Sequence, residues 1–266
     1  MRIARVELAD GTVTWAVQDE DGALCRADGD PLSGNLAATP EAIEPARWLP
    51  PLEPRAILCI GRNYAEHAAE GGAPPPDYPI LFIKNPNAAI GHLQPVRLPK
   101  VCEREVDFEG ELVAVIGKPA LDVPKEQALE YVLGYTVGHD VSARLWQTDK
   151  GGSQWCRGKS FDTFAPMGPV LVTPDELGNP SGRAIRTLLN GEQVQASTTD
   201  KMIFDVPTLI SFLSQDTTLL PGTVIMTGTP EGVGWAREPK RTLKPGDVVD
   251  VEIDGIGRLS NAVEAA

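Results

Sequence analysis

Acidic residues on a predicted strand are the first group in the sequence that could do chemistry. The segment EREVDFEGELVAVIGK covers residues 103–118, and side chains alternate between the two faces of an extended strand. Asp107, Glu109 and Glu111 therefore share one face. Carboxylates two residues apart on a strand lie roughly 7 Å from each other, close enough to repel unless water or a cation intervenes. The pattern favours either a metal site or a solvated acidic face.

A further carboxylate, Asp140, interrupts the apolar segment EYVLGYTVGHDVSARLWQ, residues 130–147. A carboxylate directly after such a strand is either a cap on the next turn or a ligand. If the two strands converge, Glu109, Glu111 and Asp140 provide three oxygen donors without an obvious histidine ligand. Such a set suits Mg²⁺, Mn²⁺ or Ca²⁺ better than zinc.

A histidine and a glutamate on a short predicted helix could act together as a base. In GRNYAEHAAEGG, residues 61–72, Asn63 and Glu66 fit a capping box that starts the helix. His67 and Glu70 share a helix face, so the carboxylate could polarise the imidazole for proton abstraction from water. The glycines and prolines that follow are compatible with a lid over a bound ligand. The alternative is a surface helix with an incidental His–Glu contact.

Other polar residues are candidates for ligand contacts. Lys159 lies in RGKSFDTFAP, where a lysine is normally solvated, whereas Arg144 and Gln147 could bind a carboxylate if their strand end lines a cleft. The glycine-rich segment TGTPEGVG, residues 227–234, lacks the Gly-Lys-Ser/Thr ending of a phosphate-binding loop. It suits a tight loop or close backbone approach to a ligand.

The elements that must position these residues are mainly short strands. Residues 1–47 predict a small β-meander, with Asp-Gly turns at residues 10–11, 21–22 and 28–29. The segment WLPPLEP has three prolines in seven residues, which indicates a stiff connector. We therefore expect a small N-terminal β domain with its proline-rich linker over residues 1–54, and a catalytic domain over residues 55–266.

The second part of the chain is predicted to be a mainly β (α+β) domain of mixed sheets. Helices are expected at Tyr64–Glu70, Lys125–Tyr131 and Pro207–Ser214 only. Strands are expected in the segments AILCIG, ILFIK, ELVAVIG, VLGYTVG, GPVLVT, TVIMTG and VVDVEIDG.

Composition restricts the class of protein. The net charge of −13 repels nucleic acid, and it also repels an anionic substrate, which would need a metal ion or well-placed cationic side chains. The four cysteines form no Cys-x-x-Cys pair, which favours reduced thiols in a cytoplasmic protein. We expect no signal peptide in MRIARVELADG and no membrane span, because the apolar runs are too short.

Taken together, these segments resemble the fumarylacetoacetate hydrolase family, specifically its short bacterial members with a small N-terminal domain. The similarity covers about residues 55–261, in the expected order. The stretches that carry it are IGRNYAEHAAE, LFIKN, VDFEGELVAVIGK, GYTVGHDVSAR, KSFDTFAPMGP, LNGEQVQASTTDKMIF, TGTPEGVG and LKPGDVVDVEIDGIGRLSN.

The resemblance implies a fold in which mixed β-strands roll into a sandwich-like barrel, assembled as a homodimer. It implies that Glu109, Glu111 and Asp140 coordinate Mg²⁺ or Mn²⁺. His67 and Glu70 match the base dyad on the lid helix of the hydrolytic members, and Lys159 matches the lysine that stabilises developing negative charge. The positions that match the substrate pocket are Arg144, Gln147 and Thr229.

The sequence departs from the family pattern at two positions. His139 stands where an asparagine usually precedes the metal-binding aspartate, and Leu145 follows Arg144 where aspartate is common. The first change could alter the surroundings of the metal, but neither touches the expected ligands. We expect no catalytic or metal-binding role for His92 and His139, and interpret both as structural residues.

The resemblance leads us to expect a divalent-metal-dependent hydrolase that cleaves a C–C bond in an acylpyruvate or related diketo acid through an enolate. The alternative is an isomerase or decarboxylase acting on acids like 2-hydroxyhepta-2,4-diene-1,7-dioate or oxaloacetate, because the same enolate serves these reactions. A different class also remains open, namely a metal-binding β module without catalytic turnover.

Overall fold

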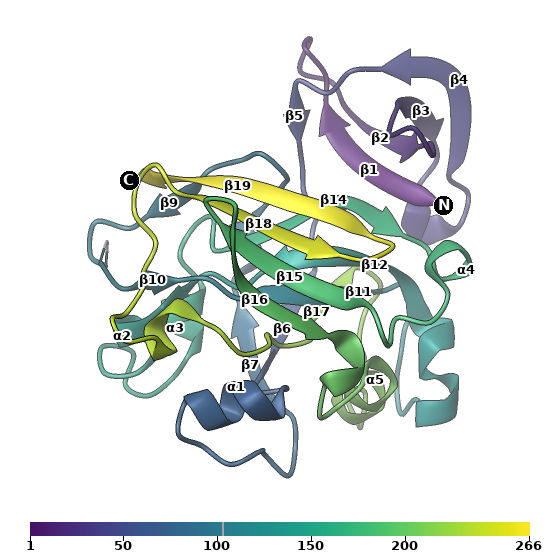
Figure 1. Ribbon diagram of the computed structural model, residues 1–266. Helices are drawn as coiled ribbons and strands as arrows, with labels where there is room; N and C mark the ends of the chain where they lie inside the picture. The colour runs from purple at the N-terminus through teal and green to yellow at the C-terminus, as the bar shows by residue number, and fades with distance from the viewer. Residues whose placement is uncertain (103) are drawn as a thin grey trace.

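The computed structural model describes residues 1–102 and 104–266, and β-strands dominate it (Figure 1). Most strands belong to one twelve-stranded sheet, whose main path runs β4-β3-β2-β1-β14-β12-β11-β17-β6-β7. A five-stranded sheet, β16-β15-β18-β19-β9, packs on it, and β10 and β13 form a separate two-stranded sheet. The mainly β prediction is confirmed. Across the described residues the large sheet is an open layer with edges at β4 and β7, so the strands form stacked sheets and not the closed barrel that was also expected.

The N-terminal strands form the predicted meander and continue the large sheet. Their bounds are β1 Arg2–Glu7, β2 Val13–Gln18, β3 Leu24–Asp28, β4 Ala37–Ile43 and β5 Arg47–Trp48. Gly11, Gly22 and Gly29 all have positive φ, as the predicted Asp-Gly turns require. Because Ile3 of β1 pairs with Leu171 of β14, backbone hydrogen bonds connect the meander to the rest of the sheet. The domain boundary at residue 54 remains an expectation.

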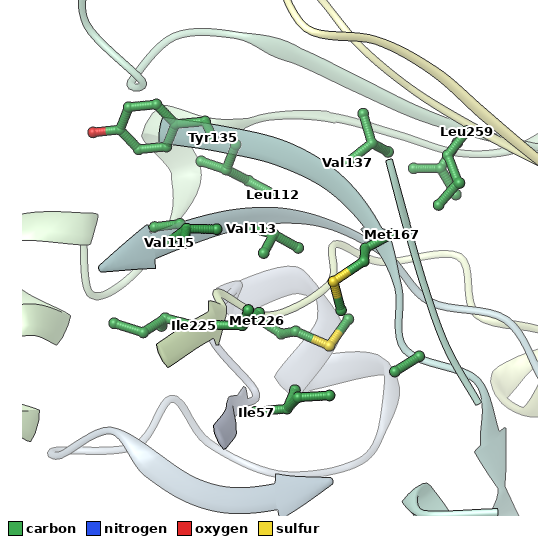
Figure 2. Packing of buried hydrophobic residues seen from close by; sticks show 14 of the residues in the cluster. Ile57, Leu112, Val113, Val115, Tyr135, Val137, Met167, Ile225, Met226 and Leu259 are labelled. Atoms are coloured by element: carbon green, nitrogen blue, oxygen red, sulfur yellow. The ribbon is translucent and has the colours of Figure 1, made fainter. Parts of the chain in front are cut away.

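The centre of the large sheet is apolar on both faces, which is typical of a strand covered on both sides. All seven residues of β11 are buried. Figure 2 shows Val113, Ile225 and Met226 packed together in this core. The remaining strands of this sheet are β6 Ala56–Gly61, β7 Ile80–Lys84, β8 Ala89–Ile90, β11 Gly110–Ile116, β12 Val132–His139, β14 Ala165–Val172 and β17 Thr223–Met226.

The five-stranded sheet lies against β11, β12 and β14 (Figure 1). Its strands are β9 Val96–Leu98, β15 Ala184–Leu189, β16 Glu192–Thr198, β18 Val248–Ile253 and β19 Gly257–Ala265. The two layers approach closely at Gly110, where an added Cβ would lie 2.2 Å from Oγ1 of Thr187. Glycine is therefore needed between the two neighbouring glutamates.

The helices are short. They are α1 Ala65–Glu70, α2 Arg144–Gln147, α3 Cys156–Lys159, α4 Pro174–Leu177 and α5 Val206–Leu213, with 3-10 helices at Pro31–Ser33, Pro86–Ala88, Lys125–Tyr131, Thr199–Lys201 and Gly234–Ala236. All three predicted helical segments are present, and the one at residues 125–131 is a 3-10 helix. Among the described residues, none of the helices has the length and apolar character to cross a bilayer.

Two local predictions are wrong. The segment 103–118 is not one continuous strand, because β10 (Val106–Asp107) pairs with β13 (Ser142–Ala143) and β11 begins only at Gly110. The capping box of α1 does not form either. Tyr64 is the residue before the helix and makes no side-chain cap, while the Asn63 amide donates to the carbonyls of Phe204 and Thr227. A buried amide with these tertiary partners cannot also cap the helix.

Candidate active site

Strand pairing brings the three predicted carboxylates together. Gly110 of β11 lies opposite His139 of β12, so the residues that flank this pair meet at one end of the two strands. These are Glu109, Glu111 and Asp140, all buried, and one ligand oxygen from each lies within 4.8 Å of the others. Three carboxylates held this close repel one another unless positive charge lies among them.

Buried cations supply part of that charge. Lys159 Nζ lies 2.7 Å from Oε2 of Glu109 and 2.8 Å from Oδ2 of Asp140. Lys84 Nζ lies 2.5 Å from Oδ1 of Asp140, and Arg144 Nη1 lies 2.6 Å from Oε1 of Glu109. Glu111 differs from the other two carboxylates. Within the described part of the chain it accepts a hydrogen bond from the Gly228 amide at 2.8 Å but has no cationic partner.

The pKa values reflect this asymmetry. Burial and then the charges of Asp140 and Glu109 raise the pKa of Glu111 well above its usual value. Burial also opposes ionisation of Glu109, but Lys159 and Arg144 outweigh it and hold the pKa of Glu109 below its usual range. The protein therefore does not fully stabilise a third negative charge at this site, and ionisation of Glu111 calls for a further cation. Three oxygen donors in this arrangement fit a hard divalent cation such as Mg²⁺, Mn²⁺ or Ca²⁺.

Asp107 does not belong to this group of carboxylates. Its Oδ2 accepts hydrogen bonds from Nε and Nη2 of Arg144 at 2.9 and 2.7 Å. The same side chain accepts the backbone amides of Gly234 and Trp235 at 2.8 and 2.9 Å. Asp107 therefore holds the arginine in place and fixes the loop that follows β17. Simple alternation predicts that Asp107 shares a face with Glu109 and Glu111. It does not, because the strand is interrupted after Asp107.

The structure places the predicted dyad at the same cavity. Nδ1 of His67 lies 2.8 Å from Oε1 of Glu70, and Oε2 of Glu70 accepts the Gly232 amide at 2.9 Å. The second contact attaches α1 to the glycine-rich loop at residues 227–234. With Nδ1 protonated and donating to Glu70, Nε2 of His67 is the nitrogen that can accept a proton.

A cavity of about 360 Å³ connects these groups. Asp140 is not part of its wall, but it accepts a hydrogen bond from Lys159, which is part of the wall. The predicted site residues on the wall are His67, Glu70, Glu109, Glu111, Arg144, Gln147, Lys159 and Thr229. The structure thus collects residues that are up to 162 positions apart in sequence around one space.

All three predicted substrate-binding residues have protein partners, and Arg144 is paired with Asp107 and Glu109. Oγ1 of Thr229 donates to the Gly110 carbonyl at 2.9 Å and accepts from Nε2 of Gln195 at 2.9 Å. Oε1 of Gln147 accepts from Nη1 of Arg144 at 3.1 Å. The Gln147 amide nitrogen is therefore the group of this pair best able to reach a ligand. The substrate-binding role of these residues stays a prediction.

Lys84 is a residue of the site that the sequence did not indicate. It ends β7, and its buried Nζ donates to the carbonyls of Val141, Lys159 and Phe164 at 3.1, 2.5 and 2.8 Å. The available signal was a lysine at the end of the apolar strand ILFIK, where a charged side chain must find buried partners. Arg62 and the aromatic residues Phe82, Trp155 and Trp235 were also missed as wall residues.

His139 ends β12 directly before Asp140 and is only 1% exposed. Neither ring nitrogen has a hydrogen-bond partner among the described residues. Burial, together with the charge of Lys84, lowers the pKa of His139 to about 3, so the ring is neutral at ordinary pH. His92 is structural, as predicted, because its Nδ1 accepts the Ser260 amide at 3.0 Å.

Comparisons with known proteins found similar sequences and similar folds. The family model described as "Fumarylacetoacetate (FAA) hydrolase C-terminal" matches residues 56–264. A mitochondrial oxaloacetate tautomerase from Xenopus laevis is 48% identical over 214 residues, which are 80% of this chain and 67% of that protein. The crystal structure of 5-carboxymethyl-2-hydroxymuconate delta-isomerase from Mycobacterium smegmatis is 39% identical, with a TM-score of 0.86 and full coverage of both chains. A fumarylacetoacetate hydrolase from Exiguobacterium antarcticum is 35% identical, with the same TM-score and coverage.

Proposed function

Because the chain belongs to the fumarylacetoacetate hydrolase family, we propose that it is a divalent-metal-dependent tautomerase or isomerase of a small 2-oxo acid. The observation that carries the proposal is that a His–Glu pair and two glutamates of a buried carboxylate triad line one cavity. A tautomerase and an isomerase among the similar proteins support this activity over C–C hydrolysis, which was the first expectation from sequence.

Glu109, Glu111 and Asp140 would hold the cation. When bound, a divalent cation supplies Lewis-acid stabilisation of negative charge on the oxygens of a 2-oxo acid. Lys159 contributes on the protein side. Its ammonium group donates to Glu109 and Asp140, so one of its three N–H bonds remains to stabilise charge on a substrate oxygen in the cavity.

His67 would move the proton. In keto–enol exchange, Nε2 accepts a proton from the carbon next to the carbonyl and the imidazolium returns it to the carbonyl oxygen. Glu70 keeps Nδ1 protonated and stabilises the positive ring during this step. Double-bond isomerisation requires the same two transfers, with return of the proton to a different carbon. No water molecule is consumed in either reaction.

Hydrolysis remains the second candidate, and the dyad is the observation that favours it. The same Nε2 could deprotonate a water molecule for attack on the distal carbonyl of an acylpyruvate. The bond between that carbon and the next would break, releasing a carboxylate and pyruvate. A hydrolase from Exiguobacterium antarcticum with the same fold also supports this alternative.

The proposal is tested by following the enol absorbance of oxaloacetate with purified protein, with Mg²⁺ or with EDTA. We expect faster conversion of enol to keto with Mg²⁺ and loss of the acceleration with EDTA. Acetylpyruvate is assayed in parallel, with products identified by NMR. Acetate and pyruvate as the only products, without acceleration on oxaloacetate or hydroxymuconate-like diacids, would reject the tautomerase in favour of the hydrolase.

A further inference from the structure

Arg62 is a cationic residue of the cavity wall outside the carboxylate triad and the His67–Glu70 pair. It follows the last residue of β6 and precedes α1, and its backbone has a φ of 54°, a left-handed conformation that is uncommon outside glycine. Residues held in such a conformation cluster at ligand sites, because the surrounding structure must enforce it. The turn directs the chain from the sheet into the helix that carries His67.

The other fixed cations on the wall are committed to carboxylates of the protein. Arg144 is paired with Asp107 and Glu109, and Lys159 with Glu109 and Asp140. Arg62 has no carboxylate partner among the described residues, and its contact is with the face of Trp155, at 5.7 Å from Cζ to the ring centroid. It therefore keeps its charge and its hydrogen-bond donors for a ligand.

Two aromatic rings lie between this arginine and the acidic triad. Nζ of Lys159 is 5.1 Å from the centroid of the Phe82 ring, and the Phe82 and Trp155 centroids are 5.5 Å apart. Gly61 makes room for this arrangement, since a Cβ there would lie 2.2 Å from Cζ3 of Trp155. Phe82 and Trp155 form an apolar stretch of wall, with a charged group of the site at each end.

From this arrangement we infer that Arg62 is a specificity residue that binds the distal carboxylate of a dicarboxylic 2-oxo acid. The 2-oxo end would lie at the triad and the carbon chain along Phe82 and Trp155. The inference rests on the proposed function and assigns a further binding residue to it. In a protein with a net charge of −13, a dianion needs a second cationic contact that a monoanion does not. A guanidinium group suits it, because it can bind a carboxylate through two parallel hydrogen bonds.

The test compares two five-carbon acids that differ only in the distal group, 2-oxoglutarate and 2-oxopentanoate, by titration calorimetry with Mg²⁺ present. We expect wild type to bind 2-oxoglutarate more tightly. Arg62→Ala should weaken 2-oxoglutarate binding about 10- to 100-fold, the usual loss for a charged hydrogen bond, and leave 2-oxopentanoate nearly unchanged. Arg62→Lys should show an intermediate loss, and it carries the test if the alanine variant does not fold.

Arg157→Ala is the matched control. Its guanidinium also stacks on aromatic rings, 4.1 Å from the Phe161 centroid, but it does not line the cavity. If the Arg62 variants lose affinity for both acids equally, or for neither acid, the role of Arg62 is overturned while the proposed function stays intact. Failure of wild type to bind either acid would instead count against the 2-oxo acid site itself, and the inference would fall with it.

Discussion

Nζ of Lys159 lies 2.7 Å from Oε2 of Glu109, inside the carboxylate triad. The same ammonium group reaches Asp140, so it lies between two oxygen donors that a metal ion would also use. A buried lysine is stable there because the carboxylates offset its loss of hydration, and they raise the pKa of Lys159 in spite of burial. Lys159 and a divalent cation therefore interact with the same carboxylates.

Replacing Lys159 should separate metal binding from catalysis. In Lys159→Met we expect Mg²⁺ to bind several-fold more tightly, because a competing positive charge is removed, while turnover falls by about 100-fold or more through loss of a charge-stabilising donor. Titration calorimetry measures the first quantity and the oxaloacetate assay the second. Lys150→Met, at an exposed position outside the cavity, is the control. Weaker Mg²⁺ binding in Lys159→Met would contradict the competition.

The Glu111 carboxyl group is expected to lower the thermal stability of the folded protein when no metal is bound. Its pKa is raised and it has no cationic partner in the described chain, so Glu111→Gln should raise the melting temperature in EDTA. The same variant should bind Mg²⁺ at least 10-fold more weakly, because one ligand charge is lost. Differential scanning calorimetry with and without Mg²⁺ measures both effects. Glu105→Gln changes a buried glutamate outside the triad and should not alter the Mg²⁺ dependence.

His67→Ala should reduce turnover by about 10²- to 10⁴-fold, the usual contribution of a positioned acid–base group, with little change in Mg²⁺ affinity. Glu70→Gln should have a smaller effect, because the imidazole remains but is less well oriented. Steady-state kinetics and metal titration on the same preparations provide the comparison. Glu66→Gln, an exposed position on α1, is the control for damage to the helix. Turnover at the wild-type rate in His67→Ala would remove this residue from the mechanism.

His139 should make stability depend on pH on the acid side of neutrality. Its folded-state pKa is about 3, below the ordinary value of 6.5, so the unfolded chain binds this proton more readily. The contribution of His139 to the free energy of unfolding is complete above pH 6.5 and is lost as the pH falls towards 3. For one proton, the free energy of unfolding changes by at most about 1.4 kcal/mol per pH unit. Urea unfolding between pH 7 and 5 should show a smaller decline for His139→Asn than for wild type. Equal declines would show that His139 does not contribute.

Local sequence was sufficient to predict the strands, the Asp-Gly turns and the helical segments, because these depend on hydrophobic alternation and on backbone preferences of neighbouring residues. The candidate ligands were also predictable, since a carboxylate inside an apolar strand needs a specific partner. The His67–Glu70 pair followed from helix spacing, and family resemblance added the role of Lys159. The continuous strand over residues 103–118 was an error, because backbone alternation alone does not show where a strand changes its pairing partner.

Only the tertiary structure decided which charges compensate one another. The partners of Asp107 come from residues 144, 234 and 235, and Lys84 reaches Asp140 from a strand 56 positions earlier in sequence. Such pairs follow from sheet order and layer packing, which depend on contacts between distant segments and leave no periodic signal. Asn63 illustrates the same point. Its sequence context indicates a helix cap, but burial beside Phe204 and Thr227 uses its amide elsewhere.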